Sequence, residues 1–170
     1  TGWVQDLAVD GDTLLSGSQD KTIRLWNWST RERECTVQTE HSGQYGVMSL
    51  AVHDGRVYSG GSKGDHTIHV WDRATWQCVK VLRGHTGLVR KMVVWQGKLI
   101  SASFDKSIKV WGLVTAEGRG GECERTLQGH TKEVASIVVC GSKLRRGSRD
   151  KSTGVWGWGG GWGLARTLTG

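Results

Sequence analysis

The stretch that decides the fold is SASFDKSIKVW at residues 101–111, because the chain carries it in four related copies. Two copies match it without a gap and one matches after a two-residue insertion: SGSQDKTIRLW (16–26), RGSRDKSTGVW (146–156) and SGGSKGDHTIHVW (59–71). Each copy ends in a tryptophan, and Trp26, Trp71, Trp111 and Trp156 lie 45, 40 and 45 residues apart. Self-similarity at this period is typical of propeller and array proteins. The sequence therefore predicts one supersecondary unit repeated four times.

Each unit is predicted to supply about four β-strands. Upstream of each copy lies an apolar stretch with a break, as in VRKMVVWQGKLI (89–100), and downstream lies another short candidate strand, as in CERTLQG (123–129). Alternating apolar residues around a turn indicate two antiparallel strands joined tightly. No segment shows helical periodicity. The chain is therefore predicted to be all-β.

These units resemble the WD40 repeat family, whose signature is a Gly-His pair and a closing Trp-Asp. Gly84-His85, Gly129-His130 and Trp71-Asp72 carry the resemblance. It implies a β-propeller segment of four blades, each of four antiparallel strands, within a ring of about seven blades. The chain starts and stops at one phase of the repeat, so we expect a segment of a longer chain. We predict a single WD40 repeat region over 1–170, with units at about 1–40, 41–84, 85–129 and 130–170.

The resemblance also implies a buried hydrogen-bonded chain in each unit, made by a loop histidine, a strand serine, a turn aspartate and the strand tryptophan. In the third unit these residues are His85, Ser101, Asp105 and Trp111. A partly buried carboxylate needs donors, and imidazole, hydroxyl and indole groups supply or relay them. The corresponding structural residues elsewhere are Ser16, Asp20 and Trp26, then His41, Asp65 and Trp71, and last His130, Asp150 and Trp156.

The fourth unit departs most from the pattern. Its serine position holds Arg146, and two strand positions hold Thr153 and Gly154 where the other units have isoleucine and a long side chain. It continues into GWGGGWG (157–163), which has no strand pattern. We expect a degenerate blade, distorted around 157–163; an erroneous stretch of sequence is the alternative.

The cysteines and histidines favour structural roles over metal binding. Cys35, Cys78 and Cys123 occupy equivalent outer positions in three units, too far apart to bridge. His66 and His69 lie three residues apart on a strand and so point to opposite faces. We predict no metal, no cofactor and no disulfide, and a reducing intracellular setting, either cytoplasmic or nuclear. No apolar run approaches the length of a membrane span.

No catalytic site is predicted in this segment, although an enzymatic domain elsewhere in a parent chain remains open. The Ser-His-Asp combination recurs in every unit and belongs to the fold. Nothing resembles a nucleophile elbow, a phosphate-binding glycine loop or a spaced carboxylate pair.

Binding is the remaining function class. The formal net charge of +7 indicates a basic surface, concentrated partly in Lys143, Arg145, Arg146, Arg149 and Lys151. One alternative is therefore an RNA- or phosphate-binding platform, although no aromatic-interleaved stacking surface accompanies the cluster. The leading interpretation is a protein-interaction scaffold, because in this family the loops with histidine and aspartate converge on one face. The predicted partner-binding residues of that face are Trp3, Gln19, Leu88, Arg90, Phe104 and Arg149.

Two narrower functions follow from the resemblance. The V-x-G-x-L turns look like the propellers of F-box and RING ubiquitin-ligase proteins and of myosin heavy chain kinase relatives, which implies substrate recognition for a ligase. The alternative is a general assembly platform that binds other proteins or peptides.

Overall fold

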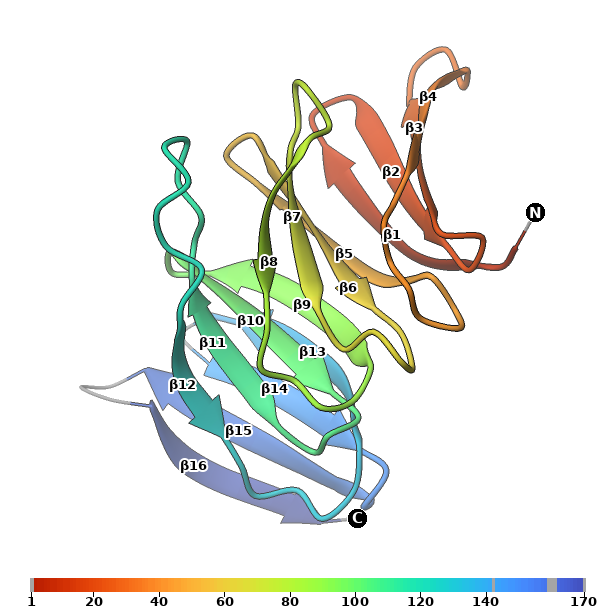
Figure 1. Cartoon of the computed structure of the whole chain (residues 1–170). Coiled ribbons are helices and arrows are strands. Elements are labelled where there is room, and N and C mark those ends of the chain that lie inside the picture. The colour runs from red at the N-terminus through yellow and green to blue at the C-terminus, as the bar shows by residue number, and fades with distance from the viewer. Residues whose placement is uncertain (1, 142, 159–161, 170) are drawn as a thin grey trace.

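The computed structural model of the chain describes residues 2–141, 143–158 and 162–169, with side chains as far as Val155. These residues form four antiparallel sheets of four strands each, in chain order, and contain no helix (Figure 1). It follows that they contain no helix long and apolar enough to cross a membrane. The predicted all-β propeller architecture is confirmed.

The strands follow one another at similar intervals. The first sheet consists of β1 Val4–Asp10, β2 Thr13–Ser18, β3 Thr22–Asn27 and β4 Arg33–Gln38. The second consists of β5 Val47–His53, β6 Arg56–Gly61, β7 Ile68–Asp72 and β8 Cys78–Leu82. The third consists of β9 Val89–Trp95, β10 Lys98–Ser103, β11 Ile108–Gly112 and β12 Cys123–Leu127. The fourth consists of β13 Val134–Cys140, β14 Lys143–Ser148, β15 Ser152–Trp158 and β16 Trp162–Thr169.

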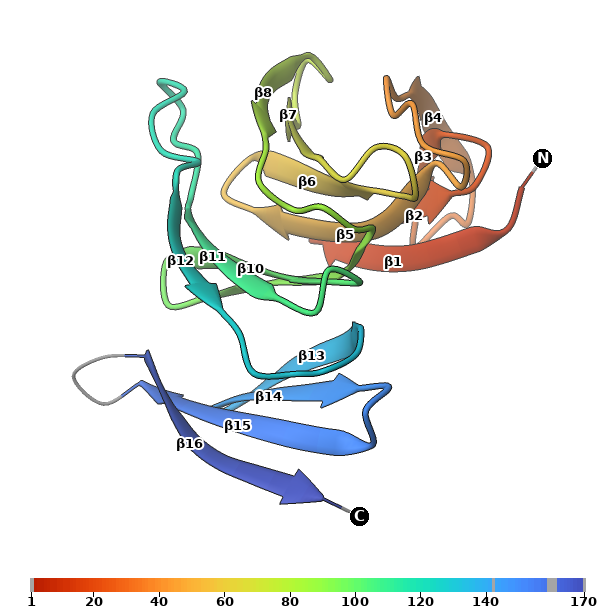
Figure 2. The same cartoon turned by 60° about the horizontal axis from the view of Figure 1, so that its bottom comes forward.

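The first strand of each sheet lies next to the first strand of the following sheet, so β1, β5, β9 and β13 form the inner row of the array (Figure 2). Hydrogen bonds join this row across sheets. Leu50 N donates to Asp6 Oδ2 at 2.9 Å, and Ser49 Oγ donates to the Val89 carbonyl at 2.9 Å. The sheets therefore stack face to face around an inner edge.

The core lies between successive sheets and repeats with the sequence. Ile23 and Ile68 face the next sheet and are covered there by its tryptophan, Trp71 or Trp111, and by its first-strand side chains. Ile108 faces Val134, Ile137 and Leu144 of the fourth sheet. Trp71 and Trp111 are buried in this way. Alternation along each strand places one residue set on each face, which is why the sequence pattern alternates.

No sheet among the described residues packs against the outer face of the first sheet. Val4 is 56% exposed, whereas its counterparts Val47 and Val89 are fully buried, and Leu7 and Val9 are also exposed. This face is apolar like the interfaces within the array. A ring of about seven blades stays a prediction.

The glycine-rich end of the chain forms more strand than its composition indicates. β15 and β16 pair through Gly157 with Gly163 and through Trp158 with Trp162, although GWGGGWG shows no strand pattern; the expected distortion around 157–163 stays a prediction. Ladder hydrogen bonds use the backbone, and a paired hairpin overrides weak strand propensity. Residues 159–161 lie outside the described residues.

Candidate functional site

The connections that carry the histidines and aspartates all lie along one side of the array, on the right in Figure 1. We call this side the loop face. It contains the loops that join each sheet to the next (39–46, 83–88 and 128–133), the turns between second and third strands (19–21, 62–67, 104–107 and 149–151), and the N-terminal residues 2–3.

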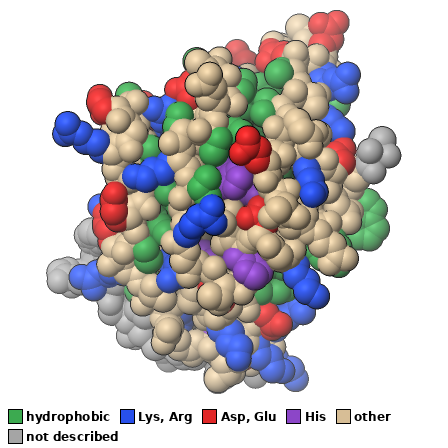
Figure 3. All heavy atoms as spheres, in the orientation of Figure 1, with side chains coloured by type: hydrophobic (Ala, Val, Ile, Leu, Met, Phe, Trp, Pro, Cys, Tyr) green, Lys and Arg blue, Asp and Glu red, His purple; other side chains and the backbone are tan. Residues whose placement is uncertain are grey.

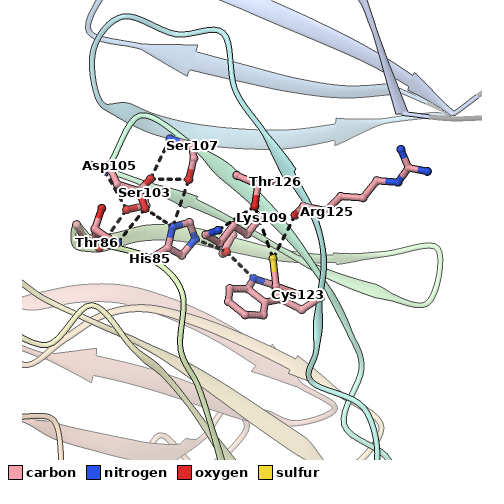
Figure 4. A network of polar contacts seen from close by, with 12 residues as sticks. His85, Thr86, Ser103, Asp105, Ser107, Lys109, Cys123, Arg125 and Thr126 are labelled. Carbon is pink, nitrogen blue, oxygen red and sulfur yellow. Dashed lines mark hydrogen bonds and ion pairs between the residues drawn. The ribbon is translucent and has the colours of Figure 1, made fainter.

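The turn aspartate of the third unit accepts hydrogen bonds from four donors (Figure 4). Asp105 Oδ2 accepts from His85 Nδ1 at 2.6 Å and from Thr86 N at 3.1 Å. Its Oδ1 accepts from Ser107 Oγ at 2.6 Å and from Ser107 N at 2.9 Å. Both carboxylate oxygens are therefore used, and the β8–β9 loop is tied to the β10–β11 turn.

The same histidine continues the chain of hydrogen bonds into the sheet. His85 Nε2 lies 2.7 Å from Ser101 Oγ, and Trp111 Nε1 donates to that oxygen at 2.8 Å. A neutral imidazole with its proton on Nδ1 satisfies every group: it donates to Asp105 and accepts from Ser101. The loop is thereby anchored to the buried tryptophan.

The second unit has the same arrangement despite its insertion. His41 Nδ1 lies 2.5 Å from Asp65 Oδ2, His41 Nε2 lies 2.8 Å from Ser59 Oγ, and Trp71 Nε1 donates to Ser59 Oγ at 2.8 Å. Thr67 Oγ1 donates to Asp65 Oδ1 at 2.5 Å. The two extra residues lengthen the turn without breaking the chain of hydrogen bonds.

The first unit uses an arginine at the corresponding place. Arg24 Nη2 donates to Asp20 Oδ2 at 2.6 Å, the oxygen that faces a histidine in the other units. Thr22 Oγ1 donates to Asp20 Oδ1 at 2.5 Å, and Trp26 Nε1 donates to Ser16 Oγ at 3.0 Å. A cation from the neighbouring strand thus stands in for the imidazole.

The fourth unit keeps the donors around its aspartate. Asp150 accepts from His130 Nδ1 at 2.7 Å, from Thr131 N at 3.1 Å and from Ser152 Oγ at 2.5 Å. The hydrogen bond between the histidine Nε2 and a strand serine is missing, because Arg146 occupies the serine position. An arginine side chain has only donors and cannot accept from the strand tryptophan. His130 Nε2 is buried with no hydrogen-bond partner among the described residues. The side chain of Trp156 lies outside the described residues.

Arg146 is accommodated by a change on the adjacent strand. Ser16, Ser59 and Ser101 each face a long side chain across the hairpin, respectively Arg24, His69 and Lys109. In the fourth unit the sizes are reversed, since Arg146 faces Gly154. A side chain at Gly154 would overlap Nε of Arg146. Arg146 and Gly154 look like two unrelated changes in the sequence. In the structure they compensate each other, because the large side chain has moved from β15 to β14 and the small one from β14 to β15.

One set of network residues was missed by sequence reasoning. Thr22, Thr67, Ser107 and Ser152 each lie two residues after the turn aspartate and donate to its Oδ1. The signal was present as a repeated D-x-[ST] pattern, since hydroxyl side chains commonly bond to nearby turn residues.

Hydrogen bonding controls the ionisation of these aspartates. Burial raises the pKa of Asp105, but hydrogen bonds from His85 and Ser107 outweigh it and hold the pKa well below its usual range. Burial likewise opposes the hydrogen bonds from Thr22 and Arg24 that lower the pKa of Asp20 to about 2. The turns therefore carry fixed negative charges at neutral pH, each surrounded by donors.

One group of side chains has residue types suited to a metal. One atom from each of His41, Asp65 and His69 lies within 4.8 Å of the others, and all three side chains are buried. The rings of His41 and His69 are stacked with centroids 4.1 Å apart. The lone pair of an imidazole nitrogen lies in the ring plane, so two stacked rings do not direct their lone pairs at one point between them. Both nitrogens of His41 also have hydrogen-bond partners already. A metal would have to displace those bonds, so the geometry favours hydrogen bonding.

The serine of the network is not placed for nucleophilic attack. Ser101 is 0% exposed and Ser59 is equally buried, each between a histidine and a tryptophan. A nucleophile must reach a substrate carbonyl or phosphoryl group. The Ser-His-Asp combination in these units therefore does not have the accessibility that catalysis requires.

Five of the six predicted partner-binding residues lie on the loop face, and Arg90 lies in β9 at its edge. Gln19 N donates to the Trp3 carbonyl at 2.9 Å, and Phe104 N donates to the Leu88 carbonyl at 3.1 Å. Trp3 is 79% exposed, so it does not pack against the neighbouring sheet. Phe104, Gln19, Leu88 and Arg90 are half-buried and Arg149 is exposed. The guanidinium of Arg149 lies over the Phe104 ring, 5.3 Å from its centroid, which joins the third and fourth units.

Comparison with known proteins agrees with the repeat pattern. A family model described as WD domain, G-beta repeat matches residues 1–27, 33–72 and 76–112, which is more than half of the chain. The computationally designed protein Ika4, solved by crystallography, superposes with a TM-score of 0.75 at 28% identity, over 94% of this chain and 93% of its own.

Three relatives illustrate the range of proteins that contain similar segments. Zinc finger CCCH domain-containing protein 17 of Oryza sativa subsp. japonica is 40% identical over 90 residues, which is 52% of this chain and 20% of that protein. Nuclear distribution protein nudF 2 of Penicillium rubens is 31% identical over 134 residues, covering 66% and 29%. Ribosome biogenesis protein YTM1 of Eremothecium gossypii is 27% identical over 125 residues, covering 64% and 26%. The chain spans less than a third of each relative's length. The narrower likeness to ubiquitin-ligase and myosin heavy chain kinase propellers stays a prediction.

Proposed function

Because the chain belongs to the WD40 repeat family, whose repeats generally act as non-catalytic scaffolds for protein interactions, we propose that it binds partner proteins through its loop face. The predicted contact residues are Trp3, Gln19, Leu88, Arg90, Phe104 and Arg149. The free thiols of all four cysteines, three of them exposed, support an intracellular setting for this interaction.

The observation that carries the proposal is the exposed tryptophan held on a fixed backbone. Trp3 is 79% exposed, yet its carbonyl is bonded to Gln19 in the first Asp turn. Large apolar or guanidinium side chains on rigid supports lose little entropy on binding and dominate interface energetics. Arg149, supported by Phe104, has the same character. Both side chains stand beside turns that the aspartate hydrogen bonds hold in place.

The test is affinity capture from cell lysate with quantitative mass spectrometry, using the full-length parent protein. We expect Trp3→Ala/Arg149→Ala to lose a defined set of proteins. Trp28→Ala/Arg119→Ala is the matched control, because it removes an exposed tryptophan and an arginine from the opposite side of the array. Equal losses from both variants would contradict the proposal. Ligase subunits among the proteins lost would favour substrate recognition, and nuclease-sensitive capture would favour the RNA-binding alternative.

A further inference from the structure

We propose that the loop face binds an acidic peptide segment of its partner, in a groove between the third and fourth units. This inference rests on the proposed function and specifies its ligand. The groove has a volume of about 800 Å³ and is lined by Lys106, Thr131, Lys132, Glu133 and Arg149. We call it the basic groove.

The loop face carries seven cations against six carboxylates, four of them the turn aspartates, whereas the opposite side carries three cations against five carboxylates. Apart from the four hydrogen-bonded aspartates, the loops and turns of the loop face carry only two carboxylates, Glu40 and Glu133. They carry the cations Lys21, Lys63, Arg83, Lys106, Lys132, Arg149 and Lys151. The connections on the opposite side have the reverse balance: three arginines, Arg31, Arg73 and Arg119, against Asp12, Glu32, Asp54, Glu117 and Glu122. Figure 3 shows lysine and arginine side chains gathered along the lower right margin, where the loop face reaches the fourth unit. A field of one sign on one face attracts partners of the other sign.

The cations of the basic groove are available to a ligand. Lys106, Lys132 and Arg149 are exposed, and none of them forms an ion pair with any residue that the structure describes. Elsewhere on the inner strands a lysine is already neutralised, as Lys91 is by Asp6 at 2.7 Å. The groove therefore combines three cations that are not held in ion pairs, next to Glu133 and to the turn aspartates Asp105 and Asp150, whose oxygens are already hydrogen-bonded.

The backbone of the groove is held on both sides. Thr131 N donates to Asp150 Oδ2 at 3.1 Å, and Ser148 Oγ donates to the Lys132 carbonyl at 3.2 Å. Arg149 N donates to the Glu133 carbonyl at 3.1 Å while its guanidinium rests on Phe104. A guanidinium fixed in this way loses less freedom when it pairs with a carboxylate.

A peptide fits the groove better than a nucleic acid. Glu133 lies among the cations, where its carboxylate repels anionic groups of either ligand. It can also accept hydrogen bonds from peptide N–H groups, which a phosphate backbone lacks, and a glutamine there would keep an acceptor oxygen. Single-stranded nucleic acid needs open aromatic faces for base stacking, and Arg149 already covers Phe104. The chemistry that remains is carboxylate recognition by lysine and arginine, with N–H recognition by Glu133 and Thr131.

The experiment measures binding of a fluorescent octapeptide of alternating aspartate and serine to the full chain, by anisotropy at about 50 mM salt, where charge interactions are weakly screened. The matched probe has asparagine in place of aspartate. We expect Lys106→Gln/Lys132→Gln to weaken binding about tenfold, and Glu133→Gln to strengthen it about threefold because a repulsive carboxylate is removed. The control Arg31→Gln/Arg119→Gln makes the same change in net charge on the opposite side and should change affinity less than about twofold.

Three results would overturn the inference. The first is equal weakening by the groove and control variants, which would indicate attraction to net charge alone. The second is equal affinity for the asparagine probe. The third is tighter binding of an oligouridine probe that Lys106→Gln/Lys132→Gln abolishes, which would assign the groove to nucleic acid. Loss of partners from Trp3→Ala/Arg149→Ala, together with no binding of the acidic probe, would retain loop-face docking and reject only the acidic ligand.

Discussion

The third and fourth units surround their aspartates with the same donors but differ below the histidine. Asp105 and Asp150 each accept from a histidine Nδ1, a loop N–H and a serine two residues ahead. In the third unit the chain continues through Ser101 to Trp111, whereas in the fourth Arg146 interrupts it. The comparison shows that the network has two separable halves: the aspartate half fixes the loops, and the serine half secures the sheet interior.

The difference also shows how the loop face persists over an altered core. The basic groove spans both units, and its loop from the fourth unit is held by Asp150 and Ser148, which belong to the unchanged half. Arg146 and Gly154 face each other within the sheet and do not line the groove. The sheet interior can therefore change while the loop geometry is kept.

The largest expected effect comes from removing the aspartate of the complete network. Asp105→Ala leaves the buried His85 and Ser107 without their acceptor, and we expect a loss of about 3–5 kcal/mol in the free energy of unfolding. Urea denaturation measures it. Asp12→Ala, in an exposed turn, should cost less than about 0.5 kcal/mol. Similar losses in the two variants would mean that the aspartate half contributes little.

A double-mutant cycle tests the exchange in the fourth unit. Gly154→Lys introduces a side chain into the space of Arg146, and we expect a loss of about 2–3 kcal/mol from overpacking. Arg146→Ser/Gly154→Lys recreates the pair found as Ser101 and Lys109 and should recover about 2 kcal/mol relative to Gly154→Lys. Additive losses measured by denaturation would show that the two positions act independently.

His69 occupies in the second unit the strand position that Lys109 and Gly154 occupy in the third and fourth. Its titration makes the second unit sensitive to pH. Burial lowers the pKa of His69 from 6.5 to about 4, helped by His41 and opposed by Asp65. Because the folded-state pKa lies below the unfolded value, the unfolded chain takes up the proton first as pH falls. The free energy of unfolding should decrease by roughly 2 kcal/mol between pH 6.5 and 4. Denaturation curves across this range should show a shallower decline for His69→Gln; an identical decline would remove His69 as the cause.

The smallest effect is expected from Ser101→Ala, which removes from the third unit the serine that the fourth unit lacks. Ser101→Ala removes the partner of His85 Nε2 and the acceptor of Trp111 Nε1, for an expected loss of about 1–2 kcal/mol. Ser136→Ala, on an exposed part of β13, provides the baseline. Thermal unfolding that does not distinguish the two variants would show that the serine half contributes little to the stability of the third unit.

The repeat was sufficient to predict the fold, because equal spacing of Asp20, Asp65, Asp105 and Asp150 from their tryptophans predicts equivalent turns and strands. Trp3 and Phe104 fall in aligned columns of the repeat, which is why the sequence predicts them as partner-binding residues, and that role stays a prediction. What escaped prediction depends on contacts across strands. Arg146 faces Gly154 only through the hairpin register, and His69 stacks on His41 from another element. A pattern read along one strand does not contain these neighbours.

The reversed pair in the fourth hairpin makes the energetic cost of two substitutions depend on the order in which they are made. Starting from a serine opposite a long side chain, as at Ser101 and Lys109, a first change to arginine would crowd two long cationic side chains into one enclosed space. A first change to glycine opens that space at a cost of about 1 kcal/mol in strand propensity. A glycine at 154 is thus expected to permit an arginine at 146, whereas the arginine opposite a long side chain is expected to be destabilising. Reversion should obey the opposite order, so the arginine must leave before a side chain can return at 154.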